Sequence, residues 1–600
     1  MNRVSVPSLV LIGALSLAAC SQSTSGSGTT PVPVAGISTV APSPDPRVGL
    51  SAGKATAGVA AWNMRLVSNT PSPALFQGVS NSDLAFRGTH VFQGNYNGFV
   101  VWDMANPKKP TLTKPYLCPA SQSDVSVYGN LLFVSGEGLT GRLDCGPQGV
   151  QDAVSHDRLR GIRIFDATDV TNPRYIANVQ TCRGSHTHTV VEDPNDKANV
   201  YIYVSGSSGV RPNDELPGCS GLMPEDDPNS ALFRIEVIKV PLAAPEQARI
   251  VSSPRIFQDL APVARHAEPV DSADLTRAAA RPPRPARPGA GRGPTQCHDI
   301  TVYPAIGLAG GACGGYGLLL DISDVANPIR IGAAADSNFS FWHSATFSND
   351  GSKILFTDEW GGGSAPRCRV TDKYEWGANA LFTLVNRQMQ FKSYYKMPAA
   401  QTSVENCVAH NGSLIPIPGR DVMVQAWYQG GISIFDWTDV SKPTEIAYYD
   451  RGPVDSTRLA SGGSWSVYWY NGYMVSSEIA RGLDIFELVP SGHLSQNEID
   501  AAKSVRFDYL NAQGQPKLVW PATFSLVLAY LDQLERVNGL AADKIGSARA
   551  ELARAENLSG QPRRDALSQL STRLHGDARG AAAEPKAHTL ASAVGELAKR

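Results

Sequence analysis

One short pattern occurs four times in this chain and limits what the chain can fold into. The four stretches read GFVVWDMANP, GIRIFDATDVTNP, YGLLLDISDVANP and GISIFDWTDVSKP. Each contains a glycine or tyrosine-glycine entry, a run of β-branched, aliphatic and aromatic residues, an aspartate and, a few residues later, a proline. Such a run is typical of a buried strand, and aspartate and proline are turn residues. The pattern therefore predicts a strand followed by a tight turn, repeated along the chain.

Each repeat lies within a unit of four short strands. A further apolar stretch follows the proline, as in RYIANV at 174–179, and a strand pair precedes the repeat, as in DVSVYGNLLFVSG at 124–136. Four antiparallel strands are what one blade of a β-propeller requires. The first strands of seven such units begin at Asp83, Asp124, His188, His298, His343, His410 and Trp465.

The predicted fold is therefore an all-β, seven-bladed β-propeller over residues 55–490, with six blades as the alternative. The last unit lacks an outer strand, and the stretch AAWNMRLVSN at 60–69 has the character to supply it. Such a strand would close the ring and remove a free sheet edge. The repeats resemble LVIVD repeats, a motif of secreted bacterial and archaeal propellers. The resemblance spans about residues 60–490; it implies the architecture and no particular reaction.

The N-terminus indicates export. Residues 1–20 carry one early Arg3 and an apolar run that ends in Leu-Ala-Ala-Cys, which is typical of a cleaved signal peptide. This ending resembles a bacterial lipobox, which implies lipidation at Cys20, a membrane anchor and, with Ser21 next, an outer-membrane or cell-surface location. An ordinary signal peptide with a chance cysteine is the alternative. Residues 21–54 are rich in Ser, Thr and Pro and predict a tether.

The other eight cysteines predict disulfides, because an even number in an exported chain favours pairing. In a propeller, the entries to first strands and the exits from second strands lie on one face, so neighbours in sequence can pair across the same rim. The predicted bonds are Cys118–Cys145, Cys182–Cys219, Cys297–Cys313 and Cys368–Cys407.

Three further segments differ in composition from the repeats. Residues 262–295 are dominated by Pro, Arg, Ala and Gly and predict a disordered insertion, with an arm for an anionic partner as the alternative. Residues 491–519 are expected to be a linker. Residues 520–600 carry leucines at helical spacing and predict a small α-helical bundle with a docking or spacer role.

The chain has only 11 histidines, yet four of them begin four successive first strands. These strand starts lie at the mouth of the central channel, so the sequence predicts a metal site there that suits Cu or Zn, or Fe if carboxylates join. The predicted ligands are His188, His298, His343 and His410. Possible supporting residues are His186, Asp299, Asp358, Glu359 and Glu478. The remaining strand starts on the channel rim are Asp83, Asp124 and Trp465. The alternative is that the histidines only line a wet channel and hold water.

Several classes of function are disfavoured. The sequence has no G-x-S-x-G elbow, no P-loop and no dinucleotide fingerprint before a helix, so no nucleotide cofactor is expected. A net charge of −2 gives no polybasic face for nucleic acid. The leading hypothesis is a lipid-anchored propeller that binds a small ligand, glycan or envelope protein at its disulfide-linked rim. The alternative is a metalloenzyme, such as an oxidoreductase, by fold-level analogy with selenium-binding-type propellers that oxidise thiols at a histidine-held copper.

Overall fold

A computed structural model describes residues 39–263 and 294–600. The predicted signal peptide, Cys20, the first part of the tether and nearly all of the insertion at 262–295 lie outside the described residues.

The repeated aspartate ends its strand in the same way in all four repeats. One carboxylate oxygen of Asp103, Asp166, Asp321 and Asp436 accepts a hydrogen bond from the backbone N–H two residues later, at 2.8–2.9 Å. This Asx turn reverses the chain before the proline, and the next strand then pairs with the one just ended. The sequence pattern thus encodes the connection between the third and fourth strands of a blade.

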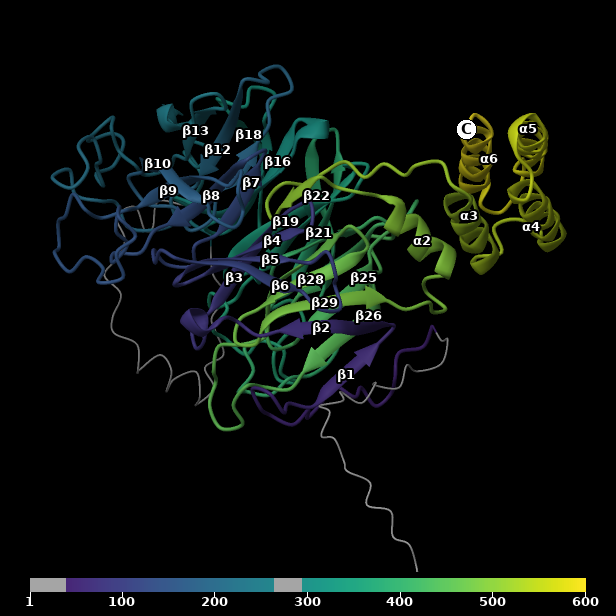
Figure 1. Cartoon of the computed structure of the whole chain (residues 1–600), viewed down its shortest axis with the longest axis horizontal. Coiled ribbons are helices and arrows are strands. Elements are labelled where there is room, and N and C mark those ends of the chain that lie inside the picture. Colours follow the sequence, from purple (N-terminus) through teal and green to yellow (C-terminus); the bar gives the residue numbers. More distant parts are fainter. Residues whose placement is uncertain (1–38, 264–293) are drawn as a thin grey trace, which may run out of the picture. The chain divides into compact units, whose positions relative to one another are not determined.

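Seven antiparallel sheets follow one another along the chain, and they confirm the predicted seven-bladed propeller (Figure 1). Blade one contains β3 (Asn81–Arg87), β4 (His90–Asn95), β5 (Gly98–Asp103) and β6 (Thr111–Leu117). Blade two contains β7 (Val125–Tyr128), β8 (Leu131–Gly136), β9 (Gly161–Asp166) and β10 (Arg174–Gln180). Blade three contains β11 (Thr189–Val191), β12 (Asn199–Val204), β13 (Glu236–Pro241) and β14 (Arg249–Ser252).

The other four blades keep the same order, with the innermost strand first. Blade four contains β15 (Cys297–Tyr303), β16 (Leu308–Cys313), β17 (Tyr316–Asp321) and β18 (Ile329–Ala335). Blade five contains β19 (Trp342–Phe347), β20 (Lys353–Asp358), β21 (Asn379–Val385) and β22 (Gln388–Tyr395). Blade six contains β23 (Gly412–Ile415), β24 (Val422–Ala426), β25 (Ile432–Asp436) and β26 (Thr444–Arg451). Blade seven contains β27 (Ser464–Tyr470), β28 (Tyr473–Glu478) and β29 (Gly482–Leu488).

The N-terminal strands close the ring, as predicted, but they do so in two pieces. Strand β2 (Met64–Thr70) pairs with β29 and becomes the outer strand of blade seven. Strand β1 (Val59–Trp62) pairs instead with β26 and becomes a fifth strand of blade six. Between them Asn63 has a φ of 56° and donates a hydrogen bond to the Ile446 carbonyl at 2.8 Å. This left-handed residue lets one extended stretch serve two blades.

The last residues of the predicted tether are held against blade six. The Arg47 guanidinium is buried, donates two hydrogen bonds to the Glu445 carboxylate at 2.7 and 2.9 Å, and lies 3.8 Å from the centre of the Tyr448 ring. A bidentate pair of this kind is a strong, directional contact. The prediction that the tether reaches residue 54 is therefore wrong for this part, since the chain is already docked at Arg47.

The segment expected to be a linker contains regular structure. Helix α2 (Gln496–Ser504) begins with a capping box between Ser495 and Glu498. Strand β30 (Tyr509–Asn511) then pairs with β3 and adds a fifth strand to blade one on its channel side. The linker prediction was wrong because β30 is too short to give an alternating pattern and its partner lies more than 400 residues away in the sequence.

Residues 505–520, called the crossing segment below, contact the inner strands at the ends remote from the strand-start histidines. Side-chain amides act there in place of a paired strand. Asn511 accepts from the Val127 N–H at 2.8 Å and donates to the Val127 carbonyl at 2.9 Å, and Gln515 contacts Phe347 in the same two ways, both at 2.8 Å. Hydrogen bonds to the other blades include those of the Gln513 and Gln515 backbone with Val302, Phe507 with Asn471, Tyr509 with Glu192, and Trp520 with Pro416. The crossing segment therefore bonds to all seven blades.

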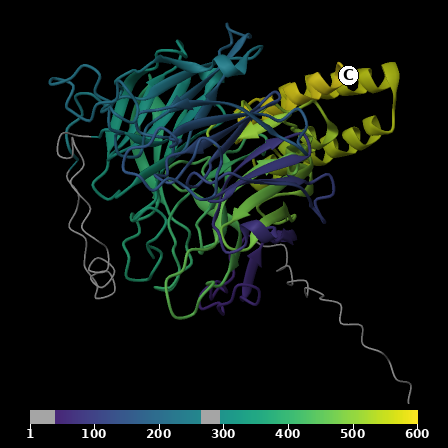
Figure 2. The ribbon, with the colours of Figure 1, turned by 60° about the vertical axis from the view of Figure 1, so that its left-hand side comes forward.

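The C-terminal residues form the predicted helical module. Its helices are α3 (Phe524–Arg536), α4 (Ala542–Glu556), α5 (Gly560–Asp577) and α6 (Glu584–Ala598), which appear together in yellow in Figure 2. They share one apolar core. The fully buried Glu498 of α2 connects this module to blade six, because its carboxylate accepts hydrogen bonds from Arg420, Gln533 and Arg536.

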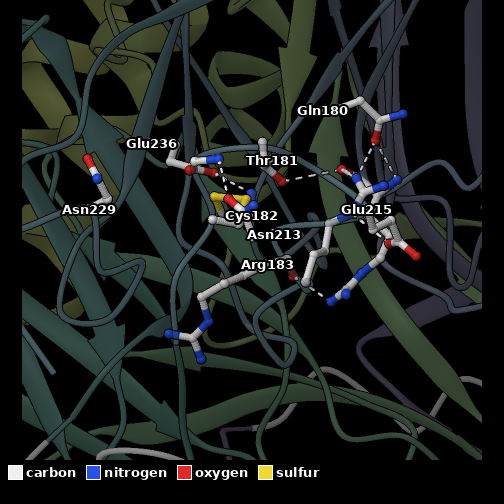
Figure 3. The surroundings of a disulfide bond; sticks show 12 residues. Gln180, Thr181, Cys182, Arg183, Asn213, Glu215, Asn229 and Glu236 are labelled. Atoms are coloured by element: carbon white, nitrogen blue, oxygen red, sulfur yellow. Dashed lines mark hydrogen bonds and ion pairs between the residues drawn. A yellow bond between two sulfur atoms is a disulfide. The ribbon is translucent and has the colours of Figure 1, made fainter. Parts of the chain in front are cut away.

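All four predicted disulfides are present. Figure 3 shows the Cys182–Cys219 bond, beside which the Cys182 N–H donates to the Glu236 carboxylate at 3.3 Å. Four disulfides indicate an oxidising, extracytoplasmic compartment. Within the described ranges, no helix is both long enough and apolar enough to cross a membrane.

Candidate metal centre

A cavity of about 1610 Å³ opens where the inner strands begin, and four histidines lie in its wall. They are His186, His298, His343 and His410. The rest of the wall is mainly serine, asparagine and glutamine side chains, glycine backbone and the aromatic rings of Tyr96, Phe341, Tyr428 and Trp465. A concave, mixed polar and aromatic surface of this size has room for a small molecule with several polar groups.

Three of these histidines come from neighbouring blades and contact one another. The ring centres of His298 and His343 are 3.9 Å apart, and those of His343 and His410 are 4.1 Å apart. Two overlapping sets of ligand atoms result, His298 with Asp299 and His343, and His343 with Glu359 and His410; within each set all atoms lie within 4.8 Å of one another. These groups could hold a metal ion.

Glu359 lies between two of the imidazoles. Its carboxylate oxygens are 3.7 Å from His343 Nε2 and 3.6 Å from His410 Nε2, and the Tyr428 hydroxyl donates a hydrogen bond to it at 2.5 Å. Burial raises the pKa of Glu359. On the other side, His298 Nδ1 is 3.0 Å from the Asp299 carboxylate. Each outer histidine therefore has a carboxylate within reach.

The protonation states suit metal binding. Burial lowers the pKa of His343 well below its usual range, and the neighbouring His298 and His410 lower it further. Burial also lowers the pKa of His410 to about 3. Both rings are therefore neutral at physiological pH. Among the described residues, each has a buried nitrogen without a hydrogen-bond partner, Nδ1 in His343 and Nε2 in His410. Neutral imidazoles with free nitrogens beside carboxylates are a donor set that fits Cu, Zn or Fe.

Irregularities in the strand pairing set the directions of the His298 and His343 side chains. The pairing of β15 with β16 is interrupted at His298 and Asp299, and that of β19 with β20 is interrupted at His343 and Ser344. A bulge places two residues opposite one and turns their side chains away from the regular alternation. At both bulges the histidine is the first of the two residues, so the two imidazoles leave the sheet at the same level.

His188 does not join this group, which corrects the four-histidine prediction. Its Nδ1 hydrogen-bonds with the Ser135 hydroxyl at 2.8 Å, and its backbone N–H donates to Asp124 at 3.2 Å. Strand β11 has no bulge, so His188 directly precedes the first paired residue, Thr189, whereas His298 stands two residues before its equivalent. A shift of one position in a strand sends a side chain to the other side, so His188 points away from the cavity.

His186 takes the place in the cavity that His188 was expected to occupy. Its ring centre is 4.6 Å from that of His298, and its Nδ1 contacts the Glu137 carboxylate. Burial lowers the pKa of His186, but the charge of Glu137 and their hydrogen bond outweigh it, so the pKa is raised. Burial likewise opposes ionisation of Glu137, yet His186 holds its pKa down to about 2. The two therefore form an ion pair at the edge of the three-histidine group.

Two of the predicted supporting acids serve the backbone instead. Asp358 accepts hydrogen bonds from the N–H groups of Ser340, Phe341 and Gly377 at 2.8–3.1 Å. Glu478 accepts from the Gly463 N–H at 2.9 Å. The sequence placed these acids on the correct rim, but they hold loops in place and do not face the histidines.

Of the three other predicted rim residues, one lies in the cavity wall and two do not. Trp465 lies in the cavity wall, its ring centre is 5.4 Å from that of His410, and its carbonyl oxygen contacts His410 Nδ1. Asp83 and Asp124 are fully buried and do not line the cavity. Sequence reasoning missed the contact of Tyr428 with Glu359; its signal is the YQGG stretch, in which Tyr428 adopts a positive φ of 53° ahead of two glycines.

A comparison with models of known protein families finds no match, and a comparison with curated proteins finds no significant one. Solved structures do match. The periplasmic gluconolactonase of Pseudomonas aeruginosa has 10% identity and a TM-score of 0.39, with 68% of this chain and 97% of that chain covered. A proposed 6-phosphogluconolactonase of Bacteroides uniformis has 11% identity and a TM-score of 0.39, with 67% and 89% covered. Hydrazine synthase of Kuenenia stuttgartiensis has 10% identity and a TM-score of 0.38, with 66% and 92% covered.

Proposed function

We infer that this chain is an extracytoplasmic metalloenzyme that acts on a small polar molecule at a metal ion held by His298, His343 and His410. One observation carries the inference. Three buried imidazoles from three successive blades stand next to one another at the wall of an open cavity, with neighbouring ring centres 3.9 and 4.1 Å apart and carboxylates beside them. Channel lining alone does not require such convergence, because a polar channel is satisfied by isolated side chains and water.

The residues of the site divide into three roles. His298, His343 and His410 would hold the ion, with Asp299 and Glu359 as further ligands or as acceptors that orient the rings. The ion would supply Lewis-acid activation of water if it is Zn, or one-electron chemistry if it is Cu or Fe. The His186–Glu137 ion pair offers a proton donor and a fixed charge at the edge of the same cavity.

The second candidate function is binding without turnover of a small ligand, glycan or envelope protein. The size of the cavity favours the larger of these ligands, a glycan or a segment of a protein, because about 1610 Å³ exceeds the roughly 300–1,000 Å³ typical of small-molecule sites. The glycines at 361–363 in the cavity wall would let such a ligand approach the backbone. The proposed anchor at Cys20 would hold either kind of protein at a membrane, and membership of the LVIVD-repeat propellers stays a prediction.

The test is metal content measured by elemental mass spectrometry on the full chain purified in detergent. The variant His343→Ala/His410→Ala removes two imidazoles of the group, and His90→Ala on strand β4, outside the cavity, is the matched control. About one Cu, Zn or Fe per chain in the parent and in His90→Ala, but not in the folded double variant, supports the metal centre. Equal metal content in all three proteins, or none after reconstitution, refutes it and leaves the binding function.

Ligand turnover separates the two candidate functions. The metal-loaded chain would be incubated with panels of lactones, esters and thiols, the substrate classes that a Lewis acid or a redox metal activates, with the double variant alongside. Conversion that disappears in the double variant supports the enzyme. Retention of a compound without conversion favours binding.

A further inference from the structure

An aromatic ring stands beside each outer histidine of the proposed metal centre. The Phe341 ring centre is 5.5 Å from that of His298, and the Trp465 ring centre is 5.4 Å from that of His410. Both aromatic side chains line the cavity and neither is buried, since Phe341 is 37% exposed and Trp465 is partly exposed. Apolar surface that is open in a cavity wall is surface that a ligand can cover. The two rings therefore offer a stacking surface beside each end of the histidine group.

The cavity wall also offers neutral hydrogen-bonding groups. Within the described residues, the side-chain hydroxyls of five wall serines make no hydrogen bond, and none of the five serines is buried. They are Ser80, Ser208, Ser340, Ser403 and Ser461. A serine hydroxyl both donates and accepts a hydrogen bond. Such groups suit ligand hydroxyls, which donate and accept in the same way.

Few charges on the described part of the wall are available to a ligand. Arg458 is the only lysine or arginine among these residues, and its side chain is 80% exposed and donates to Asp455 at 2.7 Å. Glu137 is paired with His186, and Glu359 lies between two imidazoles of the histidine group. A ligand that carries several phosphate, sulfate or carboxylate groups would therefore lack basic partners along this wall.

A neutral sugar has the two kinds of surface that this wall complements. One face of a sugar ring is made of C–H groups and stacks on an aromatic ring, whereas its edge carries hydroxyls that bond to serine side chains. The cavity of about 1610 Å³ has room for several sugar units in a row.

We propose that the cavity binds an uncharged oligosaccharide, with one sugar ring stacked on Phe341 and another on Trp465. The proposal rests on the proposed function, because it assigns a substrate class to the same cavity. A chain that contacts both aromatic rings crosses the histidine group, since one ring stands beside His298 and the other beside His410. An internal part of the oligosaccharide, and not its end, then faces the metal ion.

The test is oligosaccharide binding to the full chain, measured by isothermal calorimetry in a detergent without a sugar head group. The probes are hexasaccharides of glucose, mannose and N-acetylglucosamine, the corresponding disaccharides, and a hexasaccharide of galacturonic acid as the charged comparison. The variants Phe341→Ala and Trp465→Ala each remove one ring; the second keeps the Trp465 carbonyl that contacts His410. Phe391→Ala is the matched control, because Phe391 is also exposed but lies on the outer strand β22.

We expect at least one neutral hexasaccharide to bind the parent and Phe391→Ala, and to bind Phe341→Ala and Trp465→Ala with roughly tenfold weaker affinity. Its disaccharide should bind the parent more weakly, because it is too short to reach both rings. Failure of all three neutral hexasaccharides to bind would overturn the proposal. Equal affinity in the parent and both ring variants, or tighter binding of the galacturonic acid hexasaccharide, would overturn it as well.

Metal content measured on the same proteins separates this proposal from the proposed metal centre. Phe341→Ala and Trp465→Ala should hold as much metal as the parent, since neither ring is a ligand. No metal in any protein, together with sugar binding that depends on the two rings, would refute the metal centre and support the sugar site. Metal in the parent without binding of any neutral hexasaccharide would refute the sugar site alone.

Discussion

Replacing Asn511 by alanine should destabilise the propeller through a single residue of blade two. Asn511 pairs with both backbone groups of Val127, which is fully buried in the inner strand β7. In the Asn511→Ala variant the Val127 N–H and C=O lose the side-chain amide that pairs with them on that edge. The change removes no charge and little apolar surface, so the effect reports on the two hydrogen bonds.

The magnitude follows from the burial of these groups. A buried donor or acceptor left without a partner costs about 1–3 kcal/mol, so two would cost about 2–6 kcal/mol. The cavity of about 40 Å³ that Asn511 lines can admit water, which places the expected loss in the lower half, at about 2–4 kcal/mol. Unfolding entropy near 2.1 cal/mol/K per residue over roughly 450 residues converts this loss to a fall in Tm of about 2–4 °C.

Differential scanning calorimetry measures the Tm, and hydrogen exchange of the Val127 amide measures the local effect. The matched control is Gln513→Met, two residues away in the same segment. The Gln513 side chain is also buried, but neither its oxygen nor its nitrogen has a partner in the part of the chain that the structure describes. An apolar side chain of similar volume should therefore leave the Tm unchanged or raise it. If Asn511→Ala has the same Tm as Gln513→Met and its Val127 amide stays protected from hydrogen exchange, the reasoning is wrong.

Two further predictions concern buried acids. Burial raises the pKa of Asp450 to about 8 in the folded protein, so the stability that its neutral form contributes is full below about pH 4 and is lost as pH rises toward 8. Asp450→Asn should therefore raise the Tm at pH 8 and leave it unchanged at pH 4; the same Tm difference from the parent at both pH values would contradict this. Glu498→Ala should lower the free energy of unfolding by about 3–5 kcal/mol, because Arg420 and Arg536 lose their shared buried carboxylate. The control Asp500→Ala, on the exposed face of α2, should lower it by less than about 0.5 kcal/mol. Equal shifts in Tm for the two variants would contradict the structural role of Glu498.

The blades could be predicted from sequence because their signal is local and repeated. The aspartate of each repeat accepts a hydrogen bond from a backbone N–H only two residues away, as Asp166 does from Thr168. The residues that form the turn are therefore close together in the sequence. The disulfides followed from the blades, since each joins cysteines within 39 positions of each other. The crossing segment could not be predicted, because the partners of Asn511 and Gln515 lie 384 and 168 positions away.

The candidate site was predicted in part for the same reason. Because His298, His343 and His410 each begin the first strand of a blade, the sequence predicts that they lie on one rim of the propeller. In the structure their neighbouring rings are in contact there. The prediction that His188 is a ligand was wrong. Strands β15 and β19 each contain a one-residue bulge that the described pairing of β11 lacks, and such a bulge reverses the side of the strand that a residue faces. Residue types do not show where a bulge occurs, so the sequence predicts only a supporting role for the neighbouring His186.

The crossing segment also bears on the order in which the protein can be assembled. Its residues follow all seven blades in the chain, yet they form hydrogen bonds with the inner strands of blades one, two, four and five and with the residues just after the inner strands of blades three, six and seven. A ribosome delivers the chain from the N-terminus, so early blades must wait, with unpaired backbone at the channel, until about 430 further residues have been made. Local disulfides can form in that interval, whereas the finished ring cannot. A chain truncated before residue 505 would therefore contain every blade and still lack the last step of its folding.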